Sequence, residues 1–192
     1  LTAADVDAAL AGSPRVLLAT EGANFLEGQP DRVAQAHAWG VRHLQLIHFI
    51  QSPLGDRQTA EPVHGGLTPL GAKVVAECRR LGIVVDMAHG TAALVDGVLE
   101  ASDAIPVWSH SWVSAQGGGW TDPSYIARSL SPATARKIAA RGGAVGLWTV
   151  RVNRDPAYPV HNATTYADEI VRMCELVGPN HVSFGTDMEG AG

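Results

Sequence analysis

The feature of this sequence that most constrains its fold is a regular alternation of short apolar runs with amphipathic segments of helical period. Strands are expected over residues 15–20, 43–49, 83–88, 105–109, 144–150 and 181–186. Helices are expected around them, over residues 3–11, 30–39, 69–81, 92–100, 132–141 and 165–177. Because strands that alternate with helices are joined by crossover connections, the pattern predicts a parallel α/β sheet.

Proline and glycine mark the ends of the expected helices. Three helices have proline at the first helical position, namely Pro30, Pro69 and Pro132. Thr68 and Ser131 stand before two of these prolines as expected N-caps. Five glycines follow the helices, where a left-handed residue commonly ends a helix: Gly12, Gly40, Gly82, Gly142 and Gly178.

The length of the chain limits how complete such a fold can be. Residues 83–85 and 144–148 are apolar on both pleat faces, as in a sheet that is covered by helices and filled inside. The chain has 192 residues, whereas a closed (β/α)8 TIM-type barrel usually needs about 250. We therefore expect a single domain over residues 1–192 that forms an incomplete barrel.

Composition excludes several classes of partner. The net charge of −5 provides no basic surface for phosphates, so no nucleic acid is expected to bind. No apolar run approaches the roughly 20 residues of a membrane-spanning helix. The chain begins at Leu1 within a helix-like segment, so an upstream portion is expected to be missing and the compartment is left open. Cys78 and Cys174 lie far apart at apolar helix positions, which indicates buried free thiols.

Ionisable residues follow or end five of the expected strands: Glu21, His48, His89, His110 and Asp187. In a parallel barrel the carboxyl ends of the strands form one face, so these side chains should converge there. The long connections over residues 50–67 and 111–130 also leave carboxyl ends, where barrel enzymes keep their substrate loops.

The paired histidines are the most specific part of this pattern. His89 and His110 end consecutive strands, which lie about 4.8 Å apart, so both imidazoles can bind one metal ion. Zinc suits such nitrogen and carboxylate ligands, with manganese or iron as alternatives. Glu21 could bridge two ions that hold a hydroxide, because metal binding lowers the pKa of water to about 7. Asp187 would then accept a proton from that water.

Several short motifs resemble, in order and spacing, the membrane dipeptidase (renal dipeptidase) family of the amidohydrolase superfamily. They are EGA at residues 21–23, GVR at 40–42, LIH at 46–48, GLTPLG at 66–71, LGIVVDMAH at 81–89, SHS at 109–111 and HVSFGTD at 181–187. The resemblance implies a (β/α)8 barrel with two zinc ions that hydrolyses dipeptides. This chain would supply about strands 3 to 8 of that barrel.

The resemblance also implies roles for individual residues. Glu21 matches the carboxylate that bridges the two zinc ions, and His89 and His110 match the two histidines of the second zinc. Asp187 matches the aspartate beside the bridging water, near the first metal. Two residues match positions that contact the substrate, namely His48 and, at its carboxylate, Arg128. A small dipeptide is thus the expected partner, and a homo-oligomer is left open.

The sequence departs from the family pattern at both ends. The His-x-Asp pair that supplies the first zinc in the family occurs nowhere in the chain, and the segment after the last strand is missing. The chain is either a piece of a longer protein, truncated at both ends, or a protein that has lost half of its metal site. We expect the former, because an open barrel would expose two unpaired strand edges.

Other functions and roles fit the same residues. The site chemistry also suits a related metal-dependent amide or lactone hydrolase, and missing first-strand ligands would suit a catalytically dead barrel. Asp86 either orients a ligand histidine or is satisfied by backbone groups. The five remaining histidines are interpreted as solvated or structural: His37, His43, His64, His161 and His181. Four tryptophans are assigned mainly to the core: Trp108, Trp112, Trp120 and Trp148. Trp112 and Trp120 lie on the long connection and could instead line a pocket.

Overall fold

The computed structural model describes residues 2–114, 127–149 and 160–187. One parallel sheet carries six strands in chain order: β1 (Leu18–Thr20), β2 (Val41–Gln45), β3 (Val84–Asp86), β4 (Pro106–Ser111), β5 (Ala144–Trp148) and β6 (Val182–Gly185). The helices are α1 (Ala3–Leu10), α2 (Arg32–Ala38), α3 (Pro69–Leu81), α4 (Ala92–Ala101), α6 (Pro132–Ala140) and α7 (Ala163–Val177). Short 3-10 turns lie at Asn24–Leu26 and Pro179–His181. The expected α/β alternation is confirmed.

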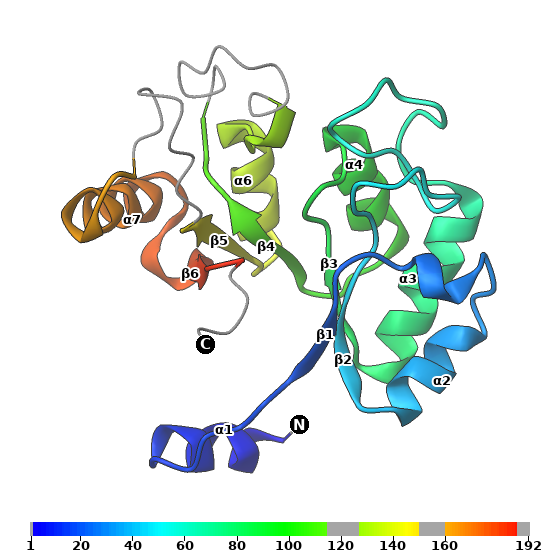
Figure 1. Cartoon of the computed structure of the whole chain (residues 1–192), viewed down its shortest axis with the longest axis horizontal. Coiled ribbons are helices and arrows are strands. Elements are labelled where there is room, and N and C mark those ends of the chain that lie inside the picture. The colour runs from blue at the N-terminus through cyan, green and yellow to red at the C-terminus, as the bar shows by residue number, and fades with distance from the viewer. Residues whose placement is uncertain (1, 115–126, 150–159, 188–192) are drawn as a thin grey trace.

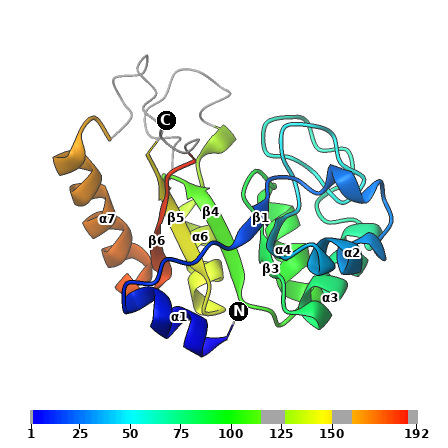
Figure 2. The same cartoon turned by 60° about the horizontal axis from the view of Figure 1, so that its bottom comes forward.

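The sheet curls, and the helices after β2 lie on its outer side (Figure 1, Figure 2). Within the described residues, β1 pairs only with β2 and β6 only with β5, so the curled sheet stays open between them. The inside of the curl is tight beside β4: a Cβ added to Gly146 or Gly185 would lie 1.8 Å or 2.0 Å from the carbonyl oxygen of Ser109. Only glycine fits where two backbones approach so closely. The open curled sheet confirms the incomplete barrel that the chain length had predicted.

Local signals set most helix boundaries. The hydroxyl of Thr68 accepts the Gly71 N–H and that of Ser131 accepts the Thr134 N–H, so α3 and α6 begin where capping residues were expected. The prediction for α2 was wrong by two residues, since the helix begins at Arg32 and Pro30 lies in the preceding turn. Gly82 ends α3 with a φ of 71°, as predicted.

Several strand boundaries differ from expectation because sheet pairing, rather than apolar composition, decides where a strand ends. The second strand begins at Val41 and ends at Gln45, so it includes His43, which had been expected at its edge or in a loop. The fourth strand continues through Ser111 after a register shift between Trp108 and Ser111. Expected strand residue 150 lies outside the described residues.

The core lies between the strands and the inner faces of their helices, and it contains Leu44, Val85 and Trp108 from the strands. Cys78 is buried on α3, but Cys174 on α7 is only half-buried, which corrects that part of the expectation. Both are free thiols.

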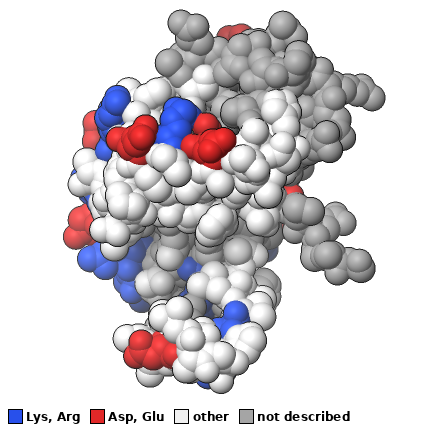
Figure 3. Space-filling view, turned by 90° about the vertical axis from the view of Figure 1, so that its left-hand side faces the viewer, with Lys and Arg blue, Asp and Glu red and all other residues white. Residues whose placement is uncertain are grey.

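Among the described residues, no helix has the length and apolar character needed to cross a bilayer. On the face that carries α7, acidic and basic side chains are intermixed among uncharged residues (Figure 3).

Candidate metal centre

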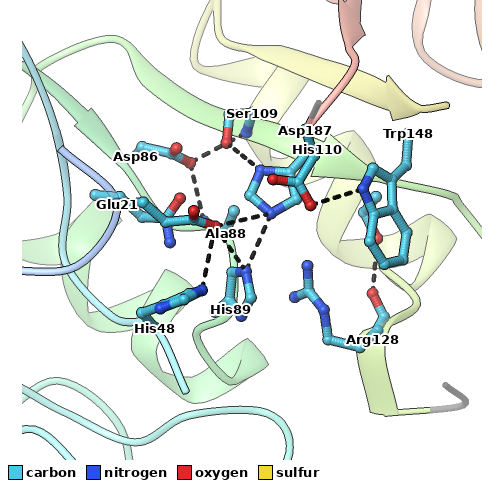
Figure 4. A network of polar contacts seen from close by, with 12 residues as sticks. Glu21, His48, Asp86, Ala88, His89, Ser109, His110, Arg128, Trp148 and Asp187 are labelled. Carbon is cyan, nitrogen blue, oxygen red and sulfur yellow. Dashed lines mark hydrogen bonds and ion pairs between the residues drawn. The ribbon is translucent and has the colours of Figure 1, made fainter. Parts of the chain in front are cut away.

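Three histidine side chains surround one carboxylate oxygen of Glu21, at or near the carboxyl ends of β1 to β4 (Figure 4). Glu21 Oε1 lies 3.3 Å from His48 Nε2, 3.3 Å from His89 Nε2 and 3.6 Å from His110 Nε2. The two Nε2 atoms of His89 and His110 are 3.0 Å apart. The convergence predicted from the strand ends is therefore present in space.

The backbone presents these side chains in different ways. Glu21 follows β1 directly, and His48 lies three residues beyond the end of β2. His89 lies beyond β3 with a φ of 68°, whereas His110 lies within β4 rather than after it. Asp187 also has a left-handed φ, of 48°. Non-glycine residues in this conformation cost about 1–3 kcal/mol each and cluster at functional sites.

Burial keeps the two inner histidines uncharged near neutral pH. His89 is almost completely buried, and this burial lowers its pKa to about 4, although the hydrogen bond to Glu21 opposes the shift. The pKa of His110 is also lowered, first by burial and then by the positive charge of Arg128. The hydrogen bond from His89 holds the pKa of Glu21 at about 2, against the effect of burial. An ionised carboxylate therefore faces neutral imidazoles.

This donor set fits a metal ion. There are two groups of three residues whose ligand atoms, within each group, all lie within 4.8 Å of one another: Glu21, His48 and His89 form one, and Glu21, His110 and Asp187 form the other. Unprotonated imidazole nitrogens and carboxylate oxygens are the forms that bind metals. In the contact between the two Nε2 atoms only one can carry a hydrogen, so a lone pair remains available there. Glu21 belongs to both groups, and its bridging of two ions stays a prediction.

Arg128 lies on another side of the site (Figure 4), and its expected role at the substrate carboxylate stays a prediction. Its side chain is 3% exposed, and its guanidinium carbon lies 5.4 Å from the centre of the Trp148 ring. It donates one hydrogen bond to Gln58 Oε1, while Nε and Nη2 have no hydrogen-bond partner among the described residues. Burial lowers the pKa of Arg128 to about 10, opposed by the charges of Asp187 and Glu21, so the guanidinium stays protonated at neutral pH.

Sequence reasoning missed the contacts that three residues make at this site, namely Trp148, Gln58 and Ser109. Trp148 had been assigned to the core, yet its Nε1 donates to Asp187 Oδ2 at 2.9 Å and its ring stacks on Trp112 at 5.7 Å. Gln58, which binds Arg128, carries no signal in its loop. Ser109 Oγ lies 2.8 Å from His110 Nδ1, and its place beside the histidine was the available clue. Trp120 lies outside the described residues.

The fold and the site together define an incomplete α/β barrel with carboxylate and imidazole side chains at or near the carboxyl ends of its strands. The profile of the family described as membrane dipeptidase (peptidase family M19) matches residues 1–192. The chain belongs to this family, as its motifs had indicated.

Curated relatives and solved structures agree with this assignment. Dipeptidase aclJ of Aspergillus oryzae is 29% identical over 177 residues, which cover 91% of this chain and 40% of that protein. Dipeptidase 3 of Homo sapiens is 25% identical over 183 residues, covering 92% and 36%. A metallo peptidase from Rhodobacter sphaeroides, solved with a phosphinate mimic of the dipeptide L-Ala-D-Ala, is 26% identical with a TM-score of 0.81, covering 99% and 55%. The chain spans about two fifths of the length of such curated relatives.

Proposed function

We propose that the protein is a metal-dependent dipeptidase that uses two zinc ions. The observation that carries the proposal is the meeting of Glu21 Oε1 with the Nε2 atoms of His89 and His110 at 3.3 Å and 3.6 Å. Membership of the dipeptidase family supports the reaction, and the nitrogen and carboxylate donor set supports zinc. A related metal-dependent amide or lactone hydrolase and a catalytically dead barrel remain as outcomes of the test.

Each metal-site residue has a proposed role. His89 and His110 would hold one ion, and Glu21 would bridge it to a second ion near Asp187. Such ions supply a hydroxide nucleophile at neutral pH and polarise a carbonyl oxygen. The His-x-Asp ligands that the family uses for the other ion do not occur in these 192 residues, so the proposal places them elsewhere in the protein.

Asp187 is the proposed acceptor for the proton of the attacking water. Its Oδ2 accepts a hydrogen bond from Trp148 Nε1, which orients the carboxylate and leaves Oδ1 available for the proton. Asp187 comes from the opposite edge of the sheet to Glu21, and the two lie in one ligand group. This position suits a base that acts beside a bridging hydroxide.

Arg128 and His48 are the proposed substrate-binding residues. The protonated guanidinium of Arg128 presents Nε and Nη2 without partners among the described residues, and this pair forms a fork that fits a carboxylate. A dipeptide has one free carboxylate at its C-terminal end, so Arg128 would select for it. His48, the most exposed of the three site histidines, would contact the rest of the substrate.

The proposal is tested on the full-length protein by metal analysis and by hydrolysis of a panel of dipeptides, N-acyl amides and lactones. We expect two zinc ions and turnover of dipeptides. His89→Ala and His110→Ala should each lower zinc affinity by at least about tenfold, since losses around metal ligands cost 10- to 100-fold. Unchanged zinc content in both variants would refute the ligand assignment. Bound zinc without turnover of any substrate would indicate a dead barrel.

The role of Asp187 has its own measurement. General bases contribute about 10² to 10⁴ in rate, so Asp187→Asn should lose turnover in that range. Some loss of metal is compatible with the proposal, because Asp187 lies in a ligand group. Near-normal turnover by Asp187→Asn with full metal content would contradict the role.

A further inference from the structure

We propose that Asp86 is the positioning residue that sets the geometry of both His89 and His110 through the backbone. The proposal deepens the proposed function, on which its meaning for metal binding rests. The carboxylate of Asp86 is buried beneath the site, and the proposed function gives it no contact with a metal or a substrate.

The carboxylate of Asp86 connects three strands just below the metal site. Asp86 ends β3 and is 1% exposed. Its Oδ1 accepts the Ala88 N–H at 2.9 Å and, from β4, the Ser109 N–H at 3.1 Å. Its Oδ2 accepts a hydrogen bond from His43 Nε2 on β2 at 3.0 Å. His43, which the sequence suggested to be either solvated or structural, thus contacts a buried carboxylate from within β2.

Asp86 Oδ1 thus accepts the backbone N–H of the residue directly before each of the two metal-site histidines. Ala88 precedes His89, and Ser109 precedes His110 (Figure 4). The two Nε2 atoms are 3.0 Å apart, so a small rotation of either peptide would change their spacing. A shared acceptor fixes the two peptides relative to each other, which separate acceptors would not do.

The left-handed conformation of His89 needs such support. Two further hydrogen bonds surround it, from Gln58 N to His89 O at 2.8 Å and from Gly90 N to Met87 O at 3.0 Å. Together with the bond from Ala88 to Asp86, they hold the strained turn from both sides. The Nδ1 atom of His89 has no hydrogen-bond partner among the described residues, so the backbone turn and the contacts of Nε2 with Glu21 and His110 set the orientation of the ring.

His110 is held by the backbone and by its neighbour. The Ser109 carbonyl packs against Gly146 and Gly185, and the Ser109 N–H points the other way, to Asp86. Ser109 Oγ lies 2.8 Å from His110 Nδ1, where it can accept a hydrogen bond that leaves Nε2 unprotonated for a metal. Because bonds to an ionised acceptor are roughly twice as strong as neutral ones, the charge of Asp86 matters for this support.

The test compares Asp86→Ala, Asp86→Asn and the control Glu169→Gln in the full-length protein. Glu169 is also a buried carboxylate, paired with Arg172 on α7. Two quantities are measured: zinc affinity by competition with a chelator, and amide hydrogen exchange at Ala88 and Ser109 in the metal-free protein. The first reports on the site, and the second reports on the proposed hydrogen bonds without any metal.

We expect Asp86→Ala to weaken zinc binding by about 10- to 100-fold, as loss of the groups that orient metal ligands does. Asp86→Asn keeps an acceptor oxygen, so its loss should be smaller, about threefold to tenfold on the same scale. Both variants should exchange the Ala88 and Ser109 amides faster. Glu169→Gln should lower the thermal unfolding temperature but leave zinc affinity and both amides as in wild type.

Wild-type zinc affinity in folded Asp86→Ala would overturn the proposal, whatever its unfolding temperature. If Asp86→Ala does not fold, Asp86→Asn decides, and wild-type affinity and exchange in that variant overturn the proposal equally. If the wild-type protein binds no zinc, the proposed function fails. Faster exchange of both amides in Asp86→Asn would then still support the positioning role, and unchanged exchange would refute it.

Discussion

Replacing Arg128 by alanine should weaken the use of dipeptides far more than the use of their C-terminal amides. Arg128 is 3% exposed and presents Nε and Nη2 without partners among the described residues. A hydrogen bond to a charged group contributes about 1.5–3 kcal/mol, so two such bonds to a carboxylate would contribute at least about 3 kcal/mol. At about 1.4 kcal/mol per factor of ten, Arg128→Ala should lower kcat/KM for a dipeptide by roughly 150-fold.

The assay compares kcat/KM for one dipeptide and for its C-terminal amide. The amide offers no carboxylate, so Arg128→Ala should lower its kcat/KM far less than that of the dipeptide, because the two hydrogen bonds from the guanidinium to the carboxylate are not made with the amide. Gln58→Ala is the matched control, because it removes a partner of Arg128 but leaves the guanidinium in place. It should affect both substrates equally. Equal losses on both substrates in Arg128→Ala would instead identify Arg128 as a structural residue stacked on Trp148.

Three further predictions concern the scaffold. Gly146→Ala puts a Cβ 1.8 Å from the Ser109 carbonyl oxygen, so it should destabilise the protein by about 1–3 kcal/mol in urea unfolding; an unchanged midpoint would contradict the tight curl. Asp56 is buried, and burial raises the pKa of its carboxyl group, but hydrogen bonds from three backbone N–H groups lower this pKa by more. The ionised carboxylate therefore stabilises the folded protein above the unfolded pKa of about 4, and this stabilisation is lost as pH falls through the lower pKa of the folded state. Asp56→Asn should therefore lower stability at pH 6 and flatten its pH dependence below 4, and parallel curves would refute this. Burial raises the pKa of Cys78 to about 12, so in a thiol-reagent time course at pH 8 only Cys174 should react before unfolding; two rapidly reacting thiols would contradict it.

The sequence by itself determined the parts of this protein that depend on local interactions. Thr68 and Pro69 begin a helix and Gly82 ends it, because a capping hydroxyl, a fixed φ and a left-handed φ act within a few residues. The alternation of these helices with apolar strands leaves a parallel sheet as the outcome. It follows that the ionisable residues at the strand ends lie on one face, which is why Glu21 and His89 could be found without coordinates.

Only the tertiary structure decided how these residues meet. A register shift between Trp108 and Ser111 carries β4 past His110, and such irregularities re-aim side chains in ways that apolar patterning does not encode. The contacts of Arg128 with Gln58 and of Trp148 with Asp187 join residues 70 and 39 positions apart. These contacts depend on the curl and pairing of the whole sheet. The hydrogen bonds that Asp86 accepts from its two neighbouring strands depend on them too. Local sequence patterns do not encode contacts between residues so far apart in the chain, because these contacts form only when the strands pack.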